Sequence, residues 1–94
     1  MEFGKWKFAS SDEARYYIRE LLAKYPVGSN VTDPEDVKFL TELLKHHPEF
    51  DAKCKGGVDT IRVVRNKKKK ATELEVRSKE GECAAMSWLP CLPS

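Results

Sequence analysis

The sequence predicts a single α+β domain in which two consecutive helices cover one face of a small, mainly antiparallel sheet. The spacing of apolar residues is helical in the first half of the chain and alternates after about residue 50. The chain has 94 residues, which is enough for one hydrophobic core and too few for a second. We therefore expect one domain over residues 1–94, with its elements in the order β-α-α-β-β-β.

A short strand and the first helix are expected near the N-terminus. Trp6 and Phe8 alternate with lysines, which is typical of an edge strand with one buried aromatic face. Ser10 can cap a helix, and Glu13 completes a capping box three residues later. Pro26 and Gly28 are expected to end this segment. The apolar stripe of the helix consists of Ala14, Tyr17, Ile18, Leu21, Leu22 and Tyr25.

The second helix is expected to begin at Pro34, a residue type that suits a first helical turn. Thr32 or Asp33 provides the cap, and acidic residues follow where the helix dipole favours them. We expect His46 and His47 in the last turn, because the next residue is a proline. The buried stripe of this helix consists of Val37, Leu40, Leu43 and Leu44.

Three strands are expected in the second half of the chain. A turn over residues 53–57 precedes the first of them, and Lys79-Glu80-Gly81 forms the turn before the last. Trp88 is expected to belong to the core, because large aromatic side chains dominate small cores. Alternating or β-branched segments place the strands over residues 58–65, 72–77 and 83–88.

Composition and cysteine usage exclude several classes of protein. No apolar run approaches the ~20 residues of a membrane span, so no membrane partner is expected. The N-terminus has no apolar stretch after its charges, so we expect no secretory signal. The three cysteines, Cys54, Cys83 and Cys91, lack Cys-x-x-Cys spacing, which favours free thiols in an intracellular, reducing compartment.

Histidines and cysteines are present, but their spacing favours neither a metal site nor a catalytic site. Structural zinc usually draws on ligands two to four residues apart, whereas His46 and His47 are adjacent. Cys54 with His47 lacks an orienting acid and an oxyanion loop. An enzyme would need a concave pocket holding His47, Asp59 or a cysteine with a perturbed pKa. We therefore expect no enzyme activity, no metal and no cofactor.

The most conspicuous feature of the chain is a group of six cations within nine residues, with no acid among them. Cations that neutralise phosphates release counterions, which gives salt-sensitive binding to RNA or DNA. An ordinary solvated loop stays open as the alternative, because charge alone does not identify a partner. The candidate nucleic-acid-binding residues are Arg62, Arg65, Lys67, Lys68, Lys69 and Lys70.

Two refinements follow from strand geometry and from aromatic residues. Arg62 and Arg65 are three apart on a predicted strand, so they point to opposite faces and at most one is expected to join the lysines. Tyr16, Trp6 and Trp88 are the candidates for stacking on unpaired bases.

Five segments occur along the chain in this order: Tyr25-Pro26-Val27-Gly28, Phe39-Leu40-x-x-Leu43-Leu44 with His47-Pro48, Lys53 leading to Gly57-Val58-Asp59-x-Ile61-x-Val63, the turn over residues 77–81, and Ser87-Trp88-x-x-Cys91. Together they resemble one known family, the defective-chloroplasts-and-leaves (DCL) domain, a domain of unknown function. The resemblance implies an α+β fold and, in plants, roles in plastid ribosomal RNA processing and ribosome assembly. A similar domain ends the largest subunit of a plant-specific RNA polymerase.

We therefore expect a non-catalytic domain that is associated with RNA or another nucleic acid, either as an RNA-binding domain or as an accessory to ribosomal RNA processing. The alternative is a protein-protein interaction module attached to transcription or ribosome-assembly machinery, with ribosomal or RNA polymerase proteins as partners. If the chain comes from a plant, the resemblance implies the plastid or the nucleus as its location.

Overall fold

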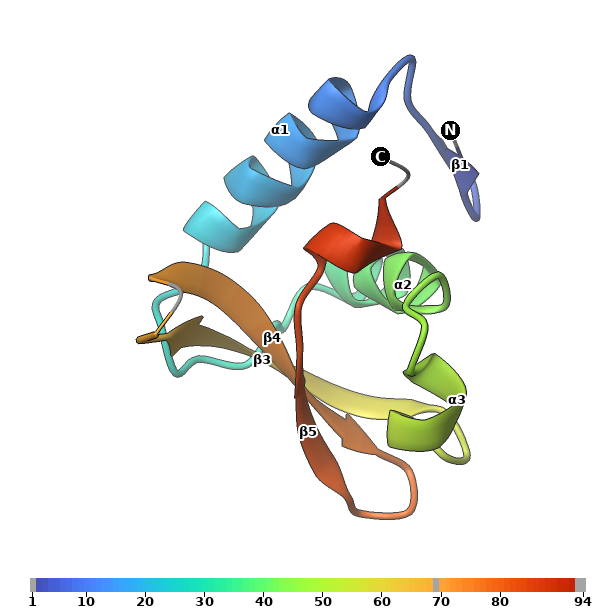
Figure 1. Cartoon of the computed structure of the whole chain (residues 1–94), viewed down its shortest axis with the longest axis vertical. Coiled ribbons are helices and arrows are strands. Elements are labelled where there is room, and N and C mark those ends of the chain that lie inside the picture. The colour runs from blue at the N-terminus through green and yellow to red at the C-terminus, as the bar shows by residue number, and fades with distance from the viewer. Residues whose placement is uncertain (1, 69, 93–94) are drawn as a thin grey trace.

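The structure, a computed structural model, describes residues 2–68 and 70–92 and confirms the predicted α+β class. Two long helices lie on one side of a three-stranded sheet (Figure 1). In chain order the elements are β1 (Glu2–Phe3), β2 (Trp6–Lys7), α1 (Ser11–Ala23), α2 (Pro34–Leu44), α3 (Phe50–Lys53), β3 (Val58–Asn66), β4 (Ala71–Ser78), β5 (Cys83–Met86) and the 3-10 helix η1 (Leu89–Cys91).

The main sheet is an antiparallel meander in the order β3-β4-β5. Leu74 of β4 is paired with Val63 of β3 and with Met86 of β5, and all three side chains are buried toward the helices. The connection between α1 and α2 covers the free edge of β3, because the Val31 N–H donates to the Ile61 carbonyl over 2.8 Å. One set of inward-facing residues thus joins the sheet to the helices in a single core.

Both long helices begin at the predicted caps. The Ser10 hydroxyl accepts a hydrogen bond from the Glu13 N–H over 3.3 Å, and the Asp33 carboxylate accepts one from the Glu35 N–H over 2.9 Å. Side-chain oxygens satisfy helix N–H groups that have no partner within the helix. The helix starts could be predicted because capping depends on residues three or fewer positions apart.

The N-terminal segment differs from the predicted single edge strand. Strands β1 and β2, which have two residues each, form a hairpin that is separate from the main sheet. The hairpin turns at Gly4, whose φ of +60° suits glycine. The Phe3 side chain is buried between aromatic rings, 6.1 Å from the Phe39 ring and 5.0 Å from the His46 ring. The hairpin is therefore held by packing on α2 rather than by the sheet.

The end of the second helix is also corrected, because α2 stops at Leu44 and the two histidines follow it. The His47 N–H donates to the Leu44 carbonyl three residues back, so the chain tightens ahead of Pro48. Residues that precede a proline are disfavoured in the α region, which explains the early stop. The predicted turn over residues 53–57 overlaps the short helix α3, which the sequence pattern did not indicate.

The last strand is shorter than predicted and ends at Met86. The Trp88 Nε1–H donates to the Thr72 carbonyl over 3.1 Å, and the Cys91 N–H donates to the Trp88 carbonyl over 3.1 Å. With these bonds the chain leaves the sheet and forms η1. Pro90 lies in η1 and has no N–H that could continue the hydrogen bonding of a strand. Trp88 is 7% exposed, so the predicted core position is confirmed although the strand does not reach it.

Candidate nucleic-acid interface

The lysine run forms the turn between β3 and β4, here called the basic turn (residues 67–70). Asn66 shapes this turn from the end of β3: its Oδ1 accepts a hydrogen bond from the Lys68 N–H over 3.0 Å. Its Nδ2 donates to Oε1 of Glu73 over 3.2 Å. Lys70 has a φ of +51°, in the left-handed region of backbone conformation that residues other than Gly, Asn and Asp seldom adopt. Lys69 lies outside the described residues.

The two arginines lie on opposite faces of the sheet, as strand alternation predicts. Arg62 is on the face away from the helices, where it forms an ion pair with Glu75. Arg65 is on the same face as the buried Val63, opposite Thr72 of β4, and it is exposed at the end of the strand. The structure therefore brings Arg65 to the helix side of the basic turn and separates Arg62 from it.

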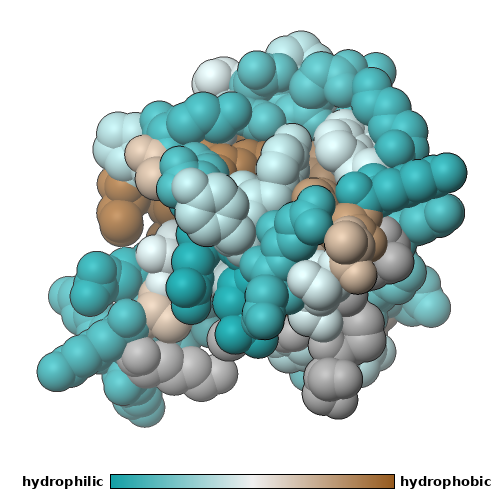
Figure 2. Space-filling model, turned by 90° about the horizontal axis from the view of Figure 1, so that it is seen from above, coloured by the Kyte–Doolittle hydropathy of each residue, from teal (hydrophilic) through white to brown (hydrophobic). Residues whose placement is uncertain are grey.

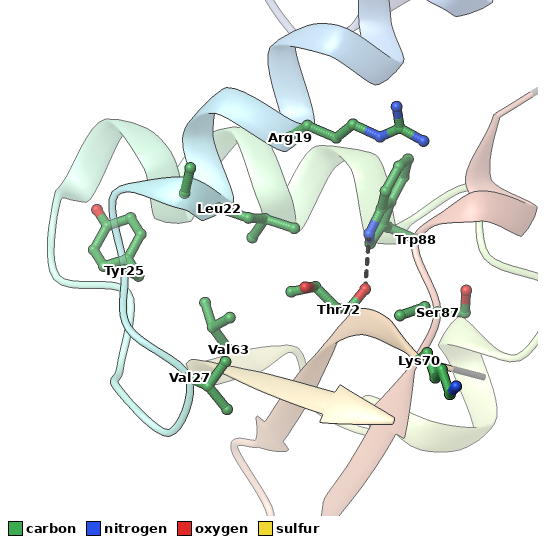
Figure 3. A pocket seen from close by; sticks show the side chains of 11 residues that line it. Arg19, Leu22, Tyr25, Val27, Val63, Lys70, Thr72, Ser87 and Trp88 are labelled. Atoms are coloured by element: carbon green, nitrogen blue, oxygen red, sulfur yellow. Dashed lines mark hydrogen bonds between the residues drawn. The ribbon is translucent and has the colours of Figure 1, made fainter. Parts of the chain in front are cut away.

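A cleft of about 460 Å³ opens beside the basic turn, on the helix side of the sheet. It lies between the second half of α1, the connection to α2, and the ends of the strands (Figure 3). Its apolar wall consists of Leu22, Val27, Val63 and Trp88. Figure 2 shows the molecule from above: the surface is mostly hydrophilic, with hydrophobic surface at one edge and in recesses between hydrophilic side chains.

The polar residues among the described lining are two cations, two residues with aliphatic hydroxyls, and Tyr25, whose hydroxyl donates to Asp36. Arg19 comes from α1 and Lys70 from the basic turn, while Thr72 and Ser87 come from β4 and the segment after β5. No acidic residue is among the described residues that line the cleft. Figure 3 shows Arg19 and Lys70 at opposite ends of the side formed by Trp88 and Ser87.

The cations of this region form no ion pair with any residue that the structure describes. By contrast, the lysines of the N-terminal hairpin and of α2 have a carboxylate within 4 Å, such as Lys5 with Glu35 at 2.8 Å. Cations that lie close together without carboxylate partners repel one another, so an anionic ligand would stabilise them. The residues concerned are Arg19, Arg65, Lys67, Lys68 and Lys70.

The wall formed by the connection from α1 to α2 is fixed by a tyrosine-carboxylate pair. The Tyr25 hydroxyl donates to Oδ2 of Asp36 over 2.7 Å, and Lys24 Nζ lies 2.9 Å from the same oxygen. Burial, followed by the hydrogen bond to Asp36, raises the pKa of Tyr25, so the phenol keeps its proton at neutral pH. The hydrogen bond to Asp36 likewise raises the pKa of Lys24. Position 25 therefore stays in place beside the cleft.

The other candidate stacking residues lie away from the cleft. Tyr16 is 67% exposed on α1, and it is not among the residues that line the cleft. Trp6 packs on Phe39 at 5.4 Å between ring centroids, with Lys5 Nζ 5.1 Å from the Trp6 ring. Of the three aromatic candidates only Trp88 is at the cleft.

The residues considered for metal or catalytic chemistry are also elsewhere. Burial lowers the pKa of His47, whose Nδ1 accepts a hydrogen bond from the Glu49 N–H over 3.0 Å. Burial raises the pKa of the Cys54 thiol and raises that of Cys91 to about 12. Cys83 is exposed, and all three cysteines are free thiols. Within residues 2–68 and 70–92, no group of three His, Cys, Asp or Glu side chains is placed to hold a metal ion.

Sequence reasoning missed Arg19 and the cleft itself. The available signal is that Arg15 and Arg19 are like charges four residues apart, which are neighbours on one helix face and destabilise an isolated helix. Arg15 adds a further observation, because its Nε is buried without a hydrogen-bond partner among the described residues.

No described helix is both long enough and apolar enough to cross a membrane.

Fold and site together define a small α+β domain with a basic cleft, whose described lining contains no acidic residue, next to a basic turn. The chain belongs to the family described as "Protein of unknown function (DUF3223)", whose model matches residues 19–92. The resemblance to the DCL domain was therefore wrong, and the plastid and ribosomal setting that it implied is withdrawn. The quoted segments consist largely of turn glycines and core side chains, which report architecture rather than one family.

A solved structure supports the same fold. The chain is similar to an uncharacterized protein from Rhodospirillum rubrum studied by solution NMR, with a TM-score of 0.86 and 25% sequence identity. The similarity covers 98% of this chain and 86% of that chain. No curated protein matches this chain. The family and the fold are therefore established, whereas none of these similarities indicates a ligand.

Proposed function

We propose that this protein is a non-catalytic domain that binds single-stranded nucleic acid, with RNA as the first ligand to test, through the basic turn and the adjoining cleft. The observation that carries the proposal is the meeting of unpaired cations with an apolar, aromatic wall. Arg19 and Lys70 border a cleft that contains Trp88 and no described acidic side chain. Phosphates and bases need these two kinds of surface side by side.

A single strand suits this surface better than a duplex. In a duplex the bases are stacked and paired, and only the phosphates would reach the basic turn. A single strand can lay its phosphates along Lys67, Lys68 and Lys70 and turn a base toward the apolar wall. The concave shape of the cleft is therefore used only by a strand whose bases are free.

The described lining of the cleft favours binding over catalysis. It includes the Thr72 and Ser87 hydroxyls but no histidine or carboxylate that could activate either of them as a nucleophile. Binding to another protein is the competing function. That kind of binding would depend little on salt, whereas binding to phosphates weakens steeply as salt rises.

Fluorescence anisotropy with a labelled RNA of about 12 nucleotides, at about 50 and about 200 mM salt, tests the proposal. The Lys67→Ser, Lys68→Ser variant should bind more weakly and with a shallower salt dependence than the parent. The Lys55→Ser, Lys79→Ser variant is the matched control, because these exposed lysines flank the other end of β3 and β4. Equal loss in both variants, or no RNA binding by the parent, contradicts the proposal.

A further inference from the structure

We infer that the cleft is a subsite for one internal nucleotide of the bound strand, with the base inside and the two flanking phosphates at Arg19 and Lys70. This inference rests on the proposed function and adds what the cleft contributes beyond the charge of the basic turn. Its first support is the position of the two cations, at opposite ends of the side formed by Trp88 and Ser87 (Figure 3). A nucleotide within a strand carries a phosphate on each side, so it needs a cation at both ends.

The chemistry of the walls fits a nucleobase. The apolar surface open to the flat face of a base comes mainly from Val27, which is 61% exposed, while Leu22 and Trp88 are buried and form the floor of the cleft. The Thr72 and Ser87 hydroxyls line the same space and form no hydrogen bond with the residues that the structure describes. They are therefore available to the polar edge of a base or to a ribose hydroxyl.

The cleft is also preorganised. The Trp88 Nε1–H donates to the Thr72 carbonyl, so the indole is fixed across the sheet and presents carbon surface to the cleft. Its volume of about 460 Å³ falls in the range of ~300–1,000 Å³ typical of small-molecule sites. A site that is already shaped avoids part of the ordering cost of binding.

Lys70 is held in an unusual conformation at the rim of this cleft. Its φ of +51° would suit glycine or asparagine, yet the position carries a long cationic side chain that lines the cleft. Residues in sparsely populated backbone regions often belong to binding sites, where the surroundings fix them. The strained backbone and the lining role thus coincide at one residue.

The test uses the intrinsic fluorescence of Trp88 in a Trp6→Phe background, so that one indole reports on the cleft. Adenosine 3′,5′-bisphosphate should change this signal saturably and bind about tenfold more tightly than adenosine 5′-monophosphate, because it has the second phosphate. Adenosine and ribose 5-phosphate should each bind more weakly than the monophosphate. The inference is overturned if no ligand saturates, if ribose 5-phosphate equals the monophosphate, or if the second phosphate adds nothing.

Two pairs of variants localise the site. Arg19→Gln should weaken binding of the bisphosphate at least about fivefold, whereas Arg77→Gln, an equal charge change on the opposite face of the sheet, should not. Ala23→Phe should block the mouth of the cleft, and Ala52→Phe on α3 serves as its control. Thermal unfolding of each variant shows whether the fold is intact, and equal effects within either pair contradict the assignment.

The outcomes separate this inference from the proposed function. If the protein binds RNA in a salt-dependent way but nucleotides do not change the Trp88 fluorescence, the subsite is overturned. The basic turn then remains as the binding surface. Absence of RNA binding overturns the proposed function, whatever the nucleotides do. Nucleotide binding without RNA binding overturns the internal position in a strand.

Discussion

Asn66 and Glu73 hold the basic turn from its two flanking strands, through a hydrogen bond of 3.2 Å between Nδ2 and Oε1. The Glu73 side chain is only 6% exposed, although it lies on the face of the sheet away from the helices. Because Asn66 also accepts the Lys68 N–H, one side chain connects the turn backbone to the start of β4. The hydrogen bonds of Asn66 therefore help to set the position of the basic turn.

Replacing Asn66 should destabilise the fold and loosen the basic turn. Asn66→Ala removes two hydrogen bonds and should lower the free energy of unfolding by about 1–2 kcal/mol. Urea unfolding measures this change, and Asn30→Ala, at an exposed position, is the control. A loss equal to that of the control would show that Asn66 does not hold the turn.

Neutralising the whole basic turn should affect binding and leave stability unchanged. The variant Lys67→Ser, Lys68→Ser, Lys69→Ser, Lys70→Ser should change the free energy of unfolding by less than about 0.5 kcal/mol. Its salt slope for a single strand should fall by nearly three, at ~0.7 per lost phosphate contact. An unchanged affinity and slope for RNA would make the turn an ordinary solvated loop.

Lys70 offers a change with opposite effects on stability and binding. Lys70→Asn should raise the free energy of unfolding by about 0.5–1 kcal/mol, because asparagine tolerates a φ of +51° better than lysine. The same variant should bind RNA more weakly, because it removes a cation from the rim of the cleft. Lys67→Asn is the comparison for stability, and a similar gain there would refute the conformational explanation.

Alkaline pH should destabilise the fold through Cys91. Burial raises the pKa of this thiol to about 12, from an ordinary value of 9.0. The unfolded chain therefore releases the proton first, so stability is complete below about pH 9 and is lost as pH rises toward the folded pKa. At about pH 10 the loss should be roughly 1.4 kcal/mol.

The control for this prediction is Cys91→Val, which removes the thiol while keeping an apolar side chain. Urea unfolding at neutral pH and at about pH 10 should show a smaller loss in this variant than in the parent. Tyr25 and Lys24 titrate in the same range and are present in both proteins, so the difference isolates Cys91. Equal losses would contradict the role assigned to the thiol.

Local patterns predicted much of the fold and little of the site. The caps at Ser10 and Asp33 depend on neighbours within three residues, and the alternation that separates Arg62 from Arg65 is a property of any strand. The hairpin at Gly4 and the four-residue helix α3 are shorter than a periodic pattern can reveal.

The cleft depends on contacts between distant parts of the chain. Arg19 and Trp88 line the same cleft because α1 lies above the sheet, and no spacing rule in the sequence predicts that arrangement. The ion pair between Arg62 and Glu75 likewise requires the register of β3 with β4. The density of positive charge in the sequence therefore indicated the basic turn, whereas the fold was needed to show which cations line the same cleft.

The most direct test of nucleic-acid binding is to follow amide and indole N–H signals by NMR while adding single-stranded RNA of about 12 nucleotides. Binding at the cleft and the basic turn should shift the Trp88 indole signal and the amide signals of Arg19 and the basic turn, and these shifts should diminish as salt is raised. Shifts confined to α2 and β5, or insensitive to salt, would contradict binding at this site.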